Sequence, residues 1–303
     1  MRLDLAYDGR GFAGWAAQPG LRTVEGELSA ALGRVLRQEP PRLVVAGRTD
    51  AGVSARGQVV HVDVPVAAWE ALPGRAAGRP DAPTPGAALL RRLAGVLADD
   101  VVVRGARPAP EGFDARFGAL SRRYAYRVVD DPSVRDPLRR GEVLVVRGAL
   151  DVGAMDRALA PLVGEHDWLP FCRPREGAST VRTVLRLGWR RDPDGLAVAD
   201  VEADAFCHHM VRSLVGASLA VGEGRRDEGW PARVLAAGVR DPAVAVAPAT
   251  GLVLEEVRYP ADEELAAQAR RARTWRGEGP APARRPPGGG DGPVAGSGHE
   301  HDT

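Results

Sequence analysis

The chain has 303 residues, 44% of them hydrophobic and 27% charged, with a formal net charge of +1. This composition is that of a globular protein, and the lack of any run of about eighteen apolar residues in the sequence excludes a membrane-spanning helix. Every basic residue is arginine, so abundant arginine does not by itself indicate a nucleic-acid partner. The two cysteines, Cys172 and Cys207, give no disulfide framework. Together with an acidic residue as early as Asp4, which argues against a secretory signal, they predict a cytoplasmic protein.

The first predicted elements surround a short loop that is flanked by glycine. Alternating apolar residues predict a strand over 2–8, and helical spacing predicts a helix over 23–37 with Thr23 as its N-cap. Strands are expected over 43–46 and 58–64, with the loop 47–52 between them. Composition then predicts an irregular loop over 73–86, a helix over 87–98 and a strand over 101–106.

The second part of the chain nearly repeats this order. It predicts strands over 121–129, 142–146, 181–190, 196–203 and 252–257, and helices over 152–163, 207–221 and 231–237. Two comparable halves, 1–110 and 111–260, predict an α+β fold in which both share an antiparallel or mixed sheet flanked by helices. Residues 261–303 are expected to form a polar helix and then a disordered tail rich in Gly, Pro and Arg, because they lack periodic apolar residues.

The loop 47–52 is the strongest candidate for chemistry. A buried strand delivers the carboxylate of Asp50 onto a tight turn between Gly47 and Gly52, where glycine permits close approach of another group. Arg48 can meet a phosphate or act as the charged partner of Asp50. The alternative interpretation is an ordinary turn in which Thr49 and Asp50 are turn residues. Spacing alone does not decide between the two.

A family resemblance favours the first interpretation. Residues 47–53 (GRTDAGV), with the alanine, glycine and glutamine that follow, resemble the catalytic block of the tRNA pseudouridine synthase A family. The resemblance extends in the expected order over about 1–260, with further matching motifs at 5–9, 23–28, 113–117, 121–126, 164–168, 205–216 and 252–260. Two departures occur: Ser54 stands where histidine is usual, and the loop 73–86 is longer than in many members.

The resemblance implies the site residues and the partners. Asp50 matches the catalytic aspartate, Tyr124 the aromatic residue that packs against the target base, and Arg48 and Arg212 basic residues close to the aspartate. It implies the pseudouridine synthase fold, a homodimer, and isomerisation of uridine to pseudouridine at positions 38, 39 and 40 in the anticodon stem-loop of tRNA. On pattern alone, Tyr124 is a sheet residue that alternates with Tyr126, one facing inward and the other outward.

The implied reaction suits these residue types. The N1–C1′ bond of uridine breaks, the base turns and C5 bonds to C1′, so no cofactor is required. A carboxylate can attack C1′ or C6, or remove the C2′ proton, and these three routes stay open. The target base must leave its stack, a cost that phosphate contacts offset. Candidates for such contacts are Arg10, Arg22, Arg56, Arg116, Arg122 and Arg123.

Three alternatives compete with this interpretation. Cys172, Cys207, His208, His209 and His166 are residue types that zinc accepts, but adjacent residues on a helix point about 100° apart, so we expect no metal site. An RNA-binding or scaffolding protein on a degenerate synthase fold should have lost the aspartate that this chain retains at position 50. A carboxylate hydrolase requires a second acid at a fixed separation, and the sequence nearby offers none.

Overall fold

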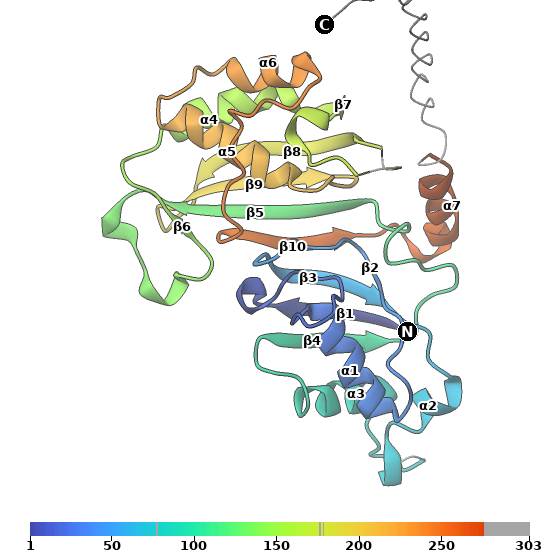
Figure 1. The fold of residues 1–303 in the computed structure, drawn as a ribbon. Helices are drawn as coiled ribbons and strands as arrows, with labels where there is room; N and C mark the ends of the chain where they lie inside the picture. The colour runs from blue at the N-terminus through green and yellow to red at the C-terminus, as the bar shows by residue number, and fades with distance from the viewer. Residues whose placement is uncertain (77, 176, 178, 276–303) are drawn as a thin grey trace, which may run out of the picture.

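A mixed β-sheet runs through the whole molecule (Figure 1). The computed structural model describes residues 1–275 apart from 77, 176 and 178. Within that range the strands are β1 (Arg2–Tyr7), β2 (Val44–Val45), β3 (Ser54–His61), β4 (Val101–Arg107), β5 (Ser121–Val129), β6 (Leu144–Val145), β7 (Gly164–Asp167), β8 (Val181–Arg191), β9 (Ala197–Ala203) and β10 (Leu252–Arg258). The helices are α1 (Val24–Leu36), α2 (Val66–Glu70), α3 (Pro85–Ala94), α4 (Val152–Leu159), α5 (Met210–Gly222), α6 (Trp230–Ala237) and α7 (Leu265–Trp275).

The order of the strands shows how the two parts of the chain join. It is β4-β1-β3-β10-β5-β9-β8-β7, with β2 beside β3 and β6 beside β5. The late strand β10 runs parallel to β3 and antiparallel to β5, so it connects the early strands to the later ones. Most other pairs are antiparallel. The expectation of an α+β fold with a mixed sheet is therefore confirmed.

Helices cover the sheet in two groups (Figure 1). In the early part of the chain α3 packs on β4 and α1 on α3, whereas in the later part α4 packs on β8 and on α5 and α6. Helix α1 begins where its sequence predicts, because the Thr23 side chain accepts a hydrogen bond from the backbone N–H of Gly26. Its apolar face, including Leu28 and Leu32, is fully buried. Within the described residues, no helix is long and apolar enough to cross a membrane.

Several boundaries differ from the sequence-based expectations. Strand β3 begins at Ser54 instead of 58, because its polar first residues pair with β1 and β10, whose positions the local pattern does not contain. Helix α5 begins at Met210 instead of 207, and the short elements α2 and β7 were not expected. The predicted disordered tail, from 277 onward, lies outside the described residues.

Candidate active site

Asp50 lies on the loop between β2 and β3, and buried hydrogen bonds hold this loop from the side of the core. The hydroxyls of Tyr7 and Thr49 share a hydrogen bond of 2.8 Å. The amide of Gln58, which is fully buried, donates to the Tyr7 hydroxyl at 3.1 Å and to the Gly47 carbonyl at 2.9 Å. The backbone immediately before Asp50 is therefore fixed by groups that the core shields from water.

The other side of the loop is held by the segment that follows β1. The backbone N–H of Trp15 donates to the Thr49 carbonyl at 3.1 Å, and that of Gly52 donates to the Phe12 carbonyl at 3.2 Å. Gly52 has a φ of +78°, a left-handed conformation that glycine adopts without steric cost. This turn presents the Asp50 side chain, which is 25% exposed, at the edge of the core.

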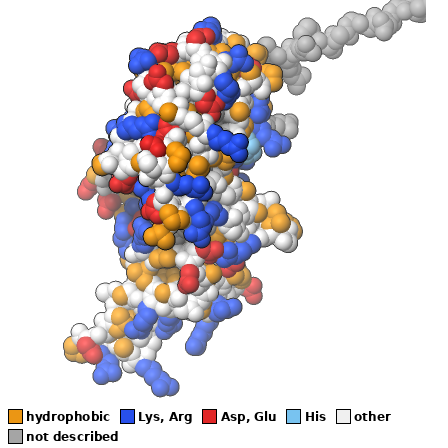
Figure 2. Space-filling model, turned by 90° about the vertical axis from the view of Figure 1, so that its left-hand side faces the viewer, with side chains coloured by type: hydrophobic (Ala, Val, Ile, Leu, Met, Phe, Trp, Pro, Cys, Tyr) orange, Lys and Arg blue, Asp and Glu red, His pale blue; other side chains and the backbone are white. Residues whose placement is uncertain are grey.

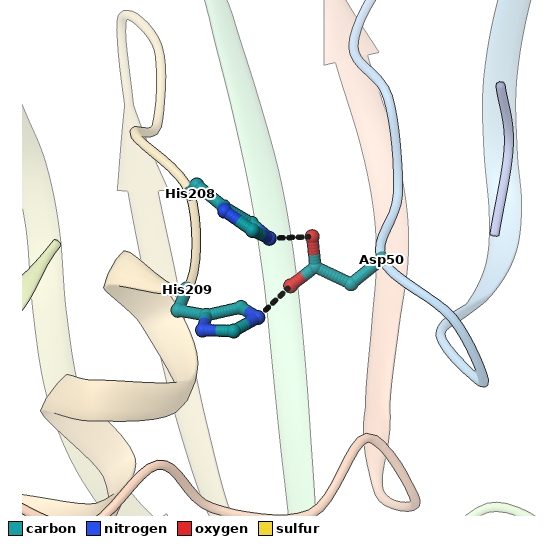
Figure 3. Close-up of side chains that lie close together, drawn as sticks. All are labelled: Asp50, His208 and His209. Atoms are coloured by element: carbon teal, nitrogen blue, oxygen red, sulfur yellow. Dashed lines mark ion pairs between the residues drawn. The ribbon is translucent and has the colours of Figure 1, made fainter. Parts of the chain in front are cut away.

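Three nitrogen-bearing side chains from the later part of the chain face Asp50, namely Arg212 and the two histidines that Figure 3 shows. The Nε2 atom of His208 lies 3.5 Å from Oδ1 of Asp50, and that of His209 lies 3.7 Å from Oδ2. The Nη1 atom of Arg212 lies 3.6 Å from the same Oδ2. The site is thus assembled from two parts of the chain that are about 160 residues apart.

The convergence of the two histidines corrects the argument from helical geometry. They precede helix α5, and His209 is its N-cap with a φ of +68°, in the left-handed region. Residues outside a helix do not follow its angular spacing, so the expectation that adjacent side chains must diverge here is wrong. The rings of His208 and His209 instead lie side by side, with centroids 3.9 Å apart. Sequence reasoning missed this pair because only the turn brings the rings together.

The environment of both imidazoles favours their neutral form. Burial lowers the pKa of His208 and of His209 below 6.5, the ordinary value for histidine, and the carboxylate of Asp50 opposes that shift. Nearby guanidinium groups lower the pKa of each ring further. The charged groups acting on the pair are Asp50, Arg173, Arg175 and Arg212.

Arg212 is held in place by the chain segment before β10. Its Nε donates to the Ala247 carbonyl at 2.7 Å, and the Ala247 N–H donates to the Arg212 carbonyl at 3.0 Å. This approach requires glycine one turn later in the helix, since a Cβ at Gly216 would lie 1.9 Å from the Ala245 carbonyl oxygen. The arginine is therefore oriented toward Asp50 instead of extending freely into solvent.

Tyr124 is buried on β5 and lies within the electrostatic range of Asp50. Its ring packs edge-on against Phe206, with centroids 5.2 Å apart. Burial raises the pKa of Tyr124, and the negative charge of Asp50 adds to that shift. Tyr126, two residues further along the same strand and therefore on the same face of the sheet, is also buried and donates to the Pro248 carbonyl. The expectation that one of the two tyrosines faces outward is wrong, because residues two apart in a strand lie on the same face of the sheet and this face is buried.

Arg48 differs from the other predicted site residues. Its side chain is exposed, and it forms no hydrogen bond or ion pair with any residue in the described ranges. The charged partner of Asp50 in this structure is Arg212 and not Arg48.

Arg122 was expected to contact phosphate, but it is a buried structural residue. The residue is 5% exposed, and its guanidinium donates to the carbonyls of Ala46, Arg116 and Asp204. It thereby links the strand that leads into the Asp50 loop to the segment that leads to the histidines. Other candidates in that set already pair with carboxylates, namely Arg10, Arg22, Arg56 and Arg123.

The two cysteines form a disulfide, so the expectation that they give none is wrong. Cys172 and Cys207 have Cα atoms 5.8 Å apart and are 35 residues apart in sequence. Their spacing alone could not reveal the pairing, because the fold brings the two segments together. The bond lies directly before His208. On the same side, the backbone N–H of Arg173 donates to the His208 carbonyl at 2.9 Å.

Asp50, His208 and His209 also have the spacing of a metal-binding group. One ligand atom from each lies within 4.8 Å of the others. The guanidinium of Arg212, however, lies against the same carboxylate and carries a fixed positive charge that repels a cation. The arrangement is better described as an acid–base cluster.

Comparison with known proteins identifies the family. The family described as tRNA pseudouridine synthase matches residues 158–260. A protein of Frankia casuarinae named tRNA pseudouridine synthase A is 59% identical to this chain, over 91% of this chain and 95% of that protein. Proteins of the same name from Streptomyces griseus subsp. griseus and Cutibacterium acnes are 55% and 51% identical, over 91% of this chain and 93% and 94% of theirs.

Among solved structures, a Cbf5-Nop10-Gar1 complex matches at 12% identity over 72% of this chain and 54% of that chain, with a TM-score of 0.29, too low to support an argument. The sequence relatives establish the family and confirm the resemblance, since each alignment covers more than nine tenths of this chain and of the relative. The chain belongs to the tRNA pseudouridine synthase A family.

Proposed function

We propose that this chain isomerises uridine to pseudouridine in tRNA, with Asp50 as its catalytic carboxylate. The observation that carries the proposal is the position of Asp50. It stands on a loop held from both sides, and Arg212, His208 and His209 face its carboxylate at 3.5–3.7 Å. Each of the three routes open to the reaction uses a carboxylate, and the groups that face Asp50 place hydrogen-bond donors and candidate proton acceptors beside it.

Tyr124 and Arg48 are proposed to bind the substrate. The detached uracil must stay in the site while it turns, and an aromatic ring can hold it by face contact. Tyr124 suits this role because its ring is fixed between the sheet and Phe206. Arg48 is exposed two residues before Asp50, where its guanidinium is available to a tRNA phosphate.

The proposed target is the anticodon stem-loop, at positions 38, 39 and 40, with the reaction in the cytoplasm. The proposal extends to a homodimer in which the two subunits together bind one tRNA. Each subunit contains both halves of the chain, 1–110 and 111–260. The face in Figure 2 carries arginines among acidic side chains, in keeping with a net charge of +1. A two-fold interface can join two local basic areas into one longer surface. Light scattering on the free protein should give twice 32.0 kDa.

The reaction adds no group and transfers no electrons to an acceptor, so it requires no cofactor. We expect full activity in excess EDTA, provided that the tRNA stays folded. A stoichiometric metal whose removal stops catalysis on folded tRNA would overturn this expectation.

The test is an assay of the purified chain on unmodified tRNA with mapping of the modified sites. Wild-type protein should form pseudouridine at the proposed positions, and Asp50→Asn should lower turnover by about 10³-fold or more while tRNA affinity stays within a few-fold. Asp81→Asn, at a carboxylate 80% exposed, is the matched control and should retain activity. Turnover by Asp50→Asn within about tenfold of wild type would remove Asp50 from the chemistry, and tRNA binding by wild type without turnover would favour a scaffolding protein.

A further inference from the structure

The isomerisation leaves one proton transfer for which Asp50 is poorly suited. When the N1–C1′ bond breaks, its electron pair stays on the uracil ring and is shared between N1 and C5. C5 then bonds to C1′ while it still carries its hydrogen, and N1 is left double-bonded to C6. A base then removes the proton from C5, and the electron pair of the C5–H bond forms the C5=C6 double bond. At the same time the π pair of the N1=C6 bond moves to N1. N1 then takes up a proton. One proton leaves and one arrives, so the step is balanced without a co-reactant.

We infer that the paired imidazoles of His208 and His209 are the base that removes this C5 proton, an inference that rests on the proposed function. The first support is position. Asp50 must reach C1′, C2′ or C6 of the substrate, and C5 bonds directly to C1′. The hydrogen on C5 is therefore released within a few ångströms of the Asp50 carboxylate, where both Nε2 atoms lie (Figure 3).

The second support is the protonation state of the surrounding groups. Tyr7 and Tyr124 are buried, and burial raises the pKa of Tyr7 to about 12 and that of Tyr124 as well, so both keep their protons at neutral pH. Arg212 is always protonated. Burial lowers the pKa of the two histidines, which favours the neutral form that can accept a proton. An imidazole is also a stronger base than a carboxylate.

The third support is that the turn holds the rings without using their nitrogens. His209 adopts a left-handed backbone conformation that is uncommon for residues other than glycine, and such conformations concentrate at functional sites. The disulfide at Cys207 and the bond from the Arg173 N–H to the His208 carbonyl fix the turn through its backbone. Neither imidazole hydrogen-bonds to any residue in the described ranges, so the nitrogens that face Asp50 are available to substrate.

The test compares tRNA carrying ordinary or C5-deuterated uridine under single-turnover conditions. In wild type near pH 7.5, deuterium should leave the rate unchanged, because proton removal is fast. In His208→Asn/His209→Asn the rate should fall by about 10²-fold or more and a primary isotope effect should appear. Added imidazole should restore part of the rate. The matched control is His299→Asn/His301→Asn, which should behave as wild type.

Wild type alone offers a second measurement, which needs no variant to fold. As pH falls below 6.5 the imidazoles take up protons, so the rate should fall and the isotope effect should emerge. The pH at which the rate falls depends on the charged groups around the two rings, which are Asp50, Arg173, Arg175 and Arg212. A double variant as fast as wild type, or slower without an isotope effect or imidazole rescue, would overturn the inference and leave the proposed function intact. Wild type that forms no pseudouridine would overturn the proposed function itself.

Discussion

The two sides of the candidate site are held by different means. The Asp50 loop rests on buried side-chain hydrogen bonds from Tyr7, Thr49 and Gln58, which lie within the first sheet strands or beside them. The turn at His208 and His209 is held through its backbone, by the Cys207 disulfide and the start of helix α5. One side therefore presents a carboxylate on a rigid core, and the other presents two imidazoles on a tethered turn.

Arg122 joins the two sides, and its removal should give the largest effect on stability. Arg122→Met leaves the carbonyls of Ala46, Arg116 and Asp204 without their donor. At roughly 1–3 kcal/mol for each orphaned acceptor, less the relief of no longer burying a charge, we expect a loss of about 3–5 kcal/mol. Chemical denaturation measures this free energy of unfolding. A loss below about 1 kcal/mol would show that the two sides do not depend on this bridge.

The disulfide should contribute less, and only to the histidine side. For a loop of 35 residues the chain-entropy estimate is about 3–4 kcal/mol, which is an upper value because native strain reduces it. Cys172→Ser should therefore lower the free energy of unfolding by up to that amount, and a reducing agent should do the same to wild type. The reducing agent should leave the variant unchanged, which serves as the control. Equal stability of oxidised and reduced wild type would contradict the tether.

The sequence predicted the Asp50 side more completely than the histidine side, for a physical reason. The N-cap Thr23 acts through its neighbours in the chain, so local pattern identifies it. The loop that carries Asp50 was also placed by the local pattern of strands and glycines, and the family resemblance then singled out Asp50. The role of Arg122 depends on three carbonyls from separate segments of the chain. The local pattern does not contain these partners, so it predicts that an arginine in a strand lies at the surface. The histidines depend on one left-handed residue at position 209, which no apolar periodicity indicates.

The parallel pairing of β10 with β3 was equally hidden. It joins residues about 200 positions apart, and only the completed sheet shows that the last strand lies between the two groups. Family resemblance supplied Tyr124 and Arg212 as candidate site residues, whereas ring packing and hydrogen bonding explain how each is held.

The central claim is that Asp50 and the two histidines form one electrostatic unit across the halves of the chain. NMR titration of the imidazole resonances in wild type and Asp50→Asn tests it most directly, with assignments from His208→Asn and His209→Asn. Because the Asp50 carboxylate raises the pKa of both rings against burial, its neutralisation should lower both values further. The pKa of His61, whose charged neighbours include Asp114 and Asp63, should not move. Unchanged pKa values of His208 and His209 in Asp50→Asn would contradict the account.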